Sequence, residues 1–134
     1  MRTLGANSAA PETSSHVYDA QMSLPGDPGA YYPSQGITGN ALTRTTDMNL
    51  RNLNRNTAVA RCSAEGITDS CDEYPFASTY EGAASQPGTS HYSVRGVPGP
   101  DNDNQGGLVS TFYGSSAANG YRVLEGDSFY VQVQ

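Results

Sequence analysis

Three carboxylates lie within the short stretch CDEYPFASTYEGA (71–83), in a chain that is otherwise poor in charge. Asp72 and Glu73 are adjacent, and Glu81 follows in the same stretch. Carboxylates can accept a proton or hold a cation, although an acidic pair more often forms a solvated face. If the stretch is extended, Asp72 and Glu73 point to opposite faces of the strand, so we expect only one of them to line a site.

A second oxygen-rich stretch, DNDNQ (101–105), lies at the start of an expected helix. Hard cations such as Mg²⁺, Mn²⁺ and Ca²⁺ prefer oxygen ligands, but the same composition is typical of an ordinary loop and helix cap. The sequence leaves both interpretations open. The candidate ligands are Asp101, Asn102, Asn104 and Gln105.

All seven basic residues are arginines, set against thirteen acids, and the net charge is −6. This balance argues against a broad cationic surface for nucleic acid. It does not exclude nucleic acid, because a metal ion held by carboxylates can supply positive charge locally. Arg51 and Arg55 would lie one helical turn apart, and with Arg61 and Arg95 they could bind phosphate or pair with surface acids.

The two cysteines, Cys62 and Cys71, enclose the polar loop SAEGITDS. A metal site would need further Cys or His nearby, and the two histidines are scattered, so we favour a disulfide and an oxidising compartment. No apolar run approaches a membrane span, so no membrane partner is expected. The first residues do not resemble a signal peptide, and we expect a trimmed mature form or a domain of a longer polypeptide.

The remaining sequence predicts one α+β domain with a small antiparallel sheet and two or three helices. Residues 1–30 are rich in Ser, Ala, Pro and Gly without periodicity, which predicts an irregular N-terminal arm ahead of a domain over 31–134. A helix is expected over 46–61, with Leu50, Leu53 and Val59 as its apolar residues.

Further along the chain, a strand is expected over 91–98 and a helix over 101–114. At the end, Phe129, Val131 and Val133 alternate with polar residues after a Gly126-Asp127 turn, which predicts a half-buried hairpin over 121–134. Tyr74 and Phe76 are expected to pack the strand that carries Asp72 against the core.

Four ordered motifs, NRNTAVARC, CDEYPFASTYEGA, SVRGVPGPDNDNQGGLVSTFY and RVLEGDSFYVQVQ, resemble the NucA/NucB deoxyribonuclease family of secreted bacterial nucleases. The likeness covers about residues 30–134. It implies an endonuclease that cuts DNA with a bound divalent ion on a core similar to the ββα-metal nucleases. In such a core one strand carries the general base, a second strand returns, and the start of a helix presents the metal ligand.

The resemblance also implies roles for the candidate residues. Asp72 matches the acid expected to act as the general base. Glu81 matches a second acidic residue of the family, expected to bind the ion through water or to orient another group, and Glu73 is the remaining catalytic candidate. Asn102 matches the asparagine expected to bind Mg²⁺ or Mn²⁺, with Ca²⁺ as a further candidate ion. Independently of the resemblance, Arg55, Arg61 and Arg95 are the candidates for substrate phosphate.

Three functions are therefore considered. The first is a secreted, metal-dependent, sequence-nonspecific DNA endonuclease, with RNA as a second candidate substrate. The second is the nuclease domain of a larger secreted toxin, which an immunity or inhibitor protein would neutralise. The third is a catalytically silent binding module stabilised by its disulfide.

Overall fold

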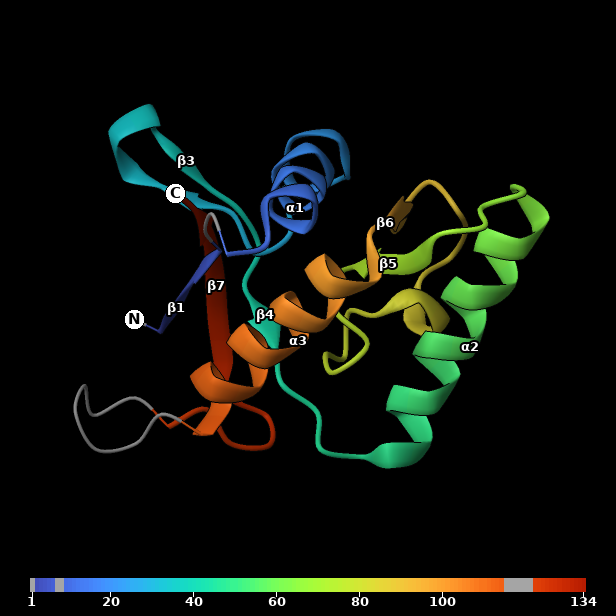
Figure 1. The fold of residues 1–134 in the computed structure, drawn as a ribbon. Helices are drawn as coiled ribbons and strands as arrows, with labels where there is room; N and C mark the ends of the chain where they lie inside the picture. Colours follow the sequence, from blue (N-terminus) through green and yellow to red (C-terminus); the bar gives the residue numbers. More distant parts are fainter. Residues whose placement is uncertain (1, 7–8, 115–121) are drawn as a thin grey trace.

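The computed structural model of the chain describes residues 2–6, 9–114 and 122–134. In this part of the chain, three α-helices combine with three small sheets (Figure 1). The helices are α1 (Pro11–Ser23), α2 (Met48–Ala64) and α3 (Gly99–Gly114). The predicted α+β class is confirmed, and so are the helices expected over 46–61 and 101–114. None of the described helices is long and apolar enough to cross a membrane.

The largest sheet has three strands, with β7 (Ser128–Val133) at its centre. One neighbour, β1 (Thr3–Ala6), runs parallel to β7, and the other, β4 (Leu42–Thr43), runs antiparallel to it. A short ribbon pairs β2 (Tyr31–Tyr32) with β3 (Ile37–Thr38). A 3₁₀ turn, η1 (Pro33–Gln35), connects β2 to β3, and a second, η2 (Ala83–Ser85), lies later in the chain. The sheets are thus antiparallel apart from the β1–β7 pair.

The predicted β-β-α order is formed by β5 (Ser70–Tyr74), β6 (Ser93–Val97) and α3. The two strands pair antiparallel, with Asp72 opposite Arg95 and Tyr74 opposite Ser93. In Figure 1, α3 crosses the middle of the molecule, with the three-stranded sheet on one side and α2 on the other. This hairpin and helix carry most of the residues that the sequence singled out.

The main core joins the three-stranded sheet to α1, α3 and the end of β5. Tyr74 and Phe76 are both buried in it, as expected, and their rings meet edge to face. Phe129 and Val131 are also fully buried, which confirms the predicted alternation at the end of the chain. The end of β5 is therefore firmly packed, so the carboxylates beside it have a rigid support.

The first thirty residues differ from the irregular arm that their composition indicated. They contain β1 and α1, and α1 packs against α3, β5 and β6. The buried face of α1 includes Thr13, His16 and Gln21, which are satisfied by hydrogen bonds and not by apolar contact. An amphipathic helix is usually recognised by the regular spacing of its apolar residues. Because the buried face of α1 is largely polar, the sequence shows no such spacing, and the helix was not predicted.

Two further expectations are corrected. The last segment does not form a hairpin of its own, because β7 pairs with β4 and β1; Tyr121, the first residue of the predicted hairpin, lies outside the described residues. In α2, Leu53 and Val59 are largely exposed, and the buried side is made of small or polar residues. These buried residues are Asn54, Ala58 and Cys62.

Candidate active site

An open groove of about 740 Å³ runs beside β5, between α2 and α3. Four consecutive β5 residues, 70–73, line it together with residues of α2 and α3, whereas no β6 residue does. Consecutive residues of a strand face opposite sides of a sheet, so a groove that meets all four must follow the strand's edge. The groove therefore lies along the edge of β5 that β6 leaves uncovered.

This position brings Asp72 and Glu73 to the same groove. The expectation that only one of them could line a site was wrong, because it assumed a site on a face of the strand. Their side chains still point apart: Asp72 contacts His16 of α1, and Glu73 is close enough to Arg55 of α2 for the guanidinium to lower its pKa. Two carboxyl groups in different environments thus border one space.

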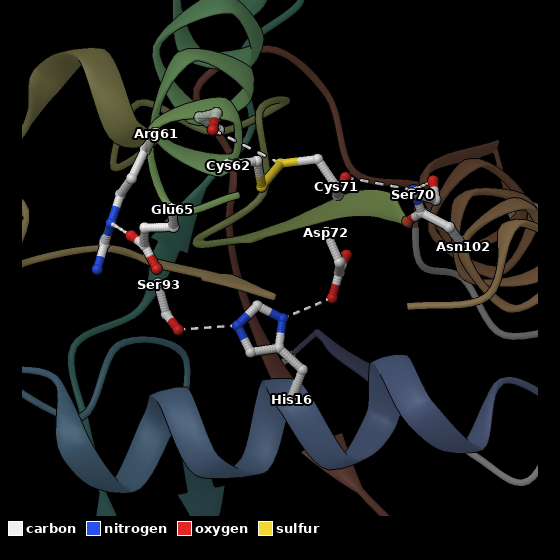
Figure 2. The surroundings of a disulfide bond; sticks show 10 residues. His16, Arg61, Cys62, Glu65, Ser70, Cys71, Asp72, Ser93 and Asn102 are labelled. Carbon is white, nitrogen blue, oxygen red and sulfur yellow. Dashed lines mark hydrogen bonds and ion pairs between the residues drawn. A yellow bond between two sulfur atoms is a disulfide. The ribbon is translucent and has the colours of Figure 1, made fainter. Parts of the chain in front are cut away.

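Asp72 is nearly buried, at 6% exposure, and its Oδ2 lies 2.6 Å from Nδ1 of His16 (Figure 2). The Nε2 of His16 lies 2.8 Å from the hydroxyl of Ser93 on β6. An ionised carboxylate can only accept, so with Asp72 ionised Nδ1 carries the hydrogen, and a neutral ring then accepts from Ser93 at Nε2. Sequence reasoning missed His16, which is 56 positions from Asp72 and belongs to no recognised motif.

Burial raises the pKa of the Glu73 carboxyl from its ordinary value of 4.5 to about 7. The guanidinium of Arg55 lowers this pKa and the neighbouring Asp72 raises it further. The Oε2 atom of Glu73 is buried without a hydrogen-bond partner. Glu73 is therefore poised to gain or lose a proton near neutral pH, the property expected of a general acid or base.

Asn102 is held by its amide nitrogen, which donates to Ser70 Oγ at 2.7 Å and to the carbonyl of Cys71 at 3.3 Å (Figure 2). Both amide hydrogens are thus used on β5. The Oδ1 atom is the atom of this side chain that remains to bind a ligand. Asn102 lines the groove, and so does its neighbour Asp103. Asp103 was not among the ligands proposed from the sequence.

The other candidate ligands at the start of α3 contact the N-terminal segment. Oδ2 of Asp101 accepts from two backbone N–H groups in the first turn of α1, at 2.6 and 3.3 Å, which is the arrangement of a helix cap supplied from another element. Asn104 donates to the carbonyl of Ala9. Gln105 accepts from the hydroxyl of Thr13 and also lines the groove.

Glu81 does not line the groove. Its Oε1 accepts from the backbone N–H of Thr43, at the end of β4, at 2.6 Å. The loop that carries Glu81 is tied to α2 by the buried Asn54, which donates to two loop carbonyls and accepts from the N–H of Ala84. Glu81 thus connects its loop to β4 through this hydrogen bond. The structure does not bring Glu81 to Asp72.

Three arginines line the groove: Arg51 and Arg55 of α2, and Arg44. The guanidinium of Arg44 lies 4.4 Å over the ring of Tyr113 and donates to the carbonyl of Val123. Arg44 follows β4 and belongs to no motif used above, so sequence reasoning missed it. Three arginines lining one groove give a net-negative protein a local cationic surface.

The other two candidate phosphate ligands lie outside this groove. Arg61 bonds Glu65 at 2.6 Å, donates to two backbone carbonyls and lies over the ring of Tyr92. Arg95 pairs with Asp19 of α1 at 2.9 Å. Both side chains are thus engaged with other parts of the protein.

The buried side-chain atoms that lack a hydrogen-bond partner, among the described residues, all belong to residues that line the groove. Three buried side-chain atoms there have no hydrogen-bond partner: Arg44 Nε, Glu73 Oε2 and Gln105 Nε2. All three residues line the groove. Buried polar groups are nearly always paired in folded proteins, so this concentration is typical of a site that binds a ligand.

A disulfide joins Cys62 of α2 to Cys71 of β5, with Cα atoms 6.1 Å apart, and confirms the predicted pairing (Figure 2). It ties the end of α2 to the residue before Asp72. Among the described residues, no cluster of three or more His, Cys, Asp or Glu side chains is arranged to hold a metal ion.

The fold and the site together define an α+β protein in which a β-β-α unit borders a groove of carboxylates, amides and arginines. The family model of the deoxyribonuclease NucA/NucB matches residues 34–132, and the chain belongs to this family. Membership implies a hydrolase that acts on DNA. No curated protein and no solved structure shows significant similarity to the chain. Helix α1, with His16, precedes the matched residues.

Proposed function

We propose that the protein is a secreted, divalent-metal-dependent DNA endonuclease without sequence preference, and that the groove beside β5 is its active site. The observation that carries the proposal is the gathering of unpaired buried polar atoms, two carboxyls and three arginines in one groove within the matched family residues. The disulfide supports secretion, because such bonds persist in oxidising compartments.

Asp72 is proposed as the general base. Hydrolysis of a phosphodiester requires a base that takes a proton from the attacking water and a group that protonates the leaving oxygen. The contact with His16 occupies one oxygen of Asp72, and the residue borders the groove, where the other oxygen can meet water. Its position on a packed strand suits this role, since a base must be held at a fixed distance from its water.

Glu73 is proposed as the second catalytic carboxyl. With a pKa of about 7, it retains a proton on a large fraction of molecules at neutral pH. Bound phosphates would raise this pKa further, since negative charge disfavours the ionised form. Glu73 can therefore supply the proton that the leaving oxygen needs, while Asp72 accepts one from water.

The residues at the start of α3 fit a hard divalent ion. Asn102 and Asp103 both line the groove, and the amide nitrogen of Asn102 is used on β5, so Oδ1 of Asn102 and the carboxylate of Asp103 are the groups that would hold the ion. Mg²⁺ and Mn²⁺ suit so small a protein ligand set, because Mg²⁺ typically keeps several waters and binds one or two protein groups together with substrate phosphate. Such an ion would neutralise charge that develops on the phosphate.

Arg51 and Arg55 are proposed to bind the phosphates of DNA on either side of the cleaved bond. They lie one helical turn apart on α2, and no ion pair is found for either among the described residues. With a net charge of −6, the rest of the surface opposes DNA binding. We expect weak, salt-sensitive affinity that depends on these few cations.

A plasmid-nicking assay tests the proposal. The protein should relax supercoiled DNA of unrelated sequences with Mg²⁺ or Mn²⁺, and EDTA should abolish the reaction. Assays with Ca²⁺ and with RNA would define the ion and the substrate. Absence of nicking with every ion would overturn the proposed function in favour of a silent binding module.

A further inference from the structure

His16, a buried residue of helix α1, contacts the carboxylate of Asp72, which borders the groove. We propose that His16 is a positioning residue, which holds Asp72 in the orientation that proton abstraction requires. The family match begins at residue 34, so family membership does not imply this role. Because it requires Asp72 to be the base, the role of His16 rests on the proposed function.

The imidazole is held at both nitrogens by the β5–β6 hairpin. Nδ1 meets Asp72 of β5 at 2.6 Å, and Nε2 meets Ser93 of β6 at 2.8 Å (Figure 2). His16 is fully buried. With both nitrogens engaged, the ring cannot rotate without losing a hydrogen bond in a buried place, which is costly.

The effect on Asp72 follows from this arrangement. A carboxylate can rotate about the bond to its Cβ, and a nearly buried one that lacks a partner pays a desolvation penalty. The Nδ1 contact stabilises the carboxylate and fixes one of its oxygens, so that the other keeps a defined direction. A base misplaced by about 1 Å can cost on the order of 10²-fold in rate.

His16 cannot itself be the base in this conformation. Its side chain has no exposed surface, does not line the groove and uses both nitrogens in hydrogen bonds. It acts through Asp72 and not on the substrate. The chain places it there by docking α1 on the β-β-α unit, through the Asp101 cap and the hydrogen bond from Thr13 to Gln105.

Two amide substitutions separate the two nitrogens of the ring. The amide nitrogen of His16→Asn can take the place of Nδ1 and donate to Asp72, whereas that of His16→Gln takes the place of Nε2 and reaches Ser93. We expect His16→Gln and His16→Ala to lower kcat for plasmid nicking by about 10- to 100-fold with little change in KM. We expect His16→Asn to recover most of the parental kcat.

Matched variants complete the test. His91→Gln makes the same substitution at the other histidine, in the loop before β6, and should leave kcat unchanged. In an Asp72→Asn background, His16→Gln should cause no further loss, because the group that it positions is already inactive. Melting temperatures identify any variant that fails to fold, and Ser93→Ala, which keeps the imidazole, should lower kcat severalfold.

The outcomes are distinct. If the parent nicks DNA and Asp72→Asn does not, but folded His16→Gln and His16→Ala cut at the parental kcat, the positioning role is wrong and the proposed function stands. Equal losses in folded His16→Asn and His16→Gln would also overturn it, since the contact with Asp72 would then not decide the rate. A parent that nicks no DNA removes the proposed function and the role of His16 together.

Discussion

His16 and Asp72 are 56 positions apart in the chain, yet the imidazole of one lies 2.6 Å from the carboxylate of the other. The contact joins α1 to the β5–β6 hairpin. Asp101 of α3 caps the first turn of α1 and so joins α1 to α3 as well. Buried carboxylates need such partners, because desolvation of an unpaired charge costs several kcal/mol. The N-terminal helix is thus part of the site's support.

Replacing Asp72 and replacing Asn102 should lower the nicking rate in different ways. Asp72→Asn keeps the shape but cannot accept a proton, so nicking should fall by about 10²-fold or more at any metal concentration. Asn102→Ala removes an oxygen ligand, so part of its loss should be recovered at higher Mg²⁺ or Mn²⁺. The measurement is the nicking rate against metal concentration.

Asn104→Ala is the matched control for this comparison. Its side chain contacts the carbonyl of Ala9 and does not line the groove, so the metal concentration for half-maximal rate should stay at the parental value. Melting temperatures distinguish a variant that has lost a metal ligand from one that has failed to fold. If Asp72→Asn cuts at the parental rate, the assignment of the base fails, and Glu73, the neighbouring carboxyl that lines the groove, becomes the candidate base.

Glu73 predicts the pH dependence of the rate. A general acid must be protonated, so the parental rate should fall as pH rises through and above about 7, the pKa of this carboxyl. Glu73→Gln cannot donate a proton, so its rate should be lower by about 10²-fold and should lack that alkaline decline. A Glu73→Gln variant with the parental rate and the parental alkaline limb would exclude this role.

The same carboxyl predicts how stability changes with pH. The folded-state pKa, about 7, lies above the ordinary value of 4.5, so the folded state binds more protons than the unfolded state between these values. The contribution to stability is complete below about 4.5 and is lost as pH rises through 7. Glu73→Gln should therefore melt near the parental temperature at pH 5 and above it at pH 8. Equal shifts at both pH values would show that the raised pKa is absent.

Local patterns predicted the elements that carry the family motifs. Asp47 caps α2, and the alternation of Phe129 and Val131 marks a strand with one buried side. These signals lie within a few residues of the element that they define. The partners of β7 could not be read in this way, because β1 and β4 are distant in sequence and no short turn sets the pairing.

The candidate site shows the same division between local and distant information. Asp72, Glu73 and Asn102 were identified because they stand in motifs, whereas His16 and Arg44 reach the site only through the packing of distant segments. Arg61 and Arg95 were natural candidates for phosphate. The partner of Arg95, Asp19, becomes apparent only in three dimensions, whereas Glu65 lies four positions after Arg61, beyond the end of the helix expected over 46–61. Charge alone does not reveal which arginine faces a groove.

The groove arginines predict the salt dependence of DNA binding. Arg51→Ala and Arg55→Ala should each weaken binding and reduce the slope of log K against log salt by about one, since each removes about one phosphate contact. Arg61→Ala is the control, because Arg61 lies outside the groove and bonds Glu65. Binding measured between low and moderate salt tests this. A slope altered by Arg61→Ala but not by Arg55→Ala would place the DNA elsewhere.

The disulfide between Cys62 and Cys71 predicts a loss of stability on its removal. It closes a short loop, and in the chain-entropy description such a closure contributes about 2 to 3 kcal/mol. The double variant Cys62→Ser, Cys71→Ser should lose about that much free energy of unfolding in a denaturant titration. It should also nick DNA more slowly, because the backbone of Cys71 holds Asn102 and precedes Asp72.

The intact bond can be checked independently of stability. Mass spectrometry of the unreduced protein should show two hydrogens fewer than the reduced form, and reduction should lower the denaturation midpoint as the double variant does. Because the parent has no other cysteines, any effect of reductant is specific to this bond. Two free thiols in freshly prepared protein, or an unchanged midpoint after complete reduction, would contradict the stabilising role of the disulfide.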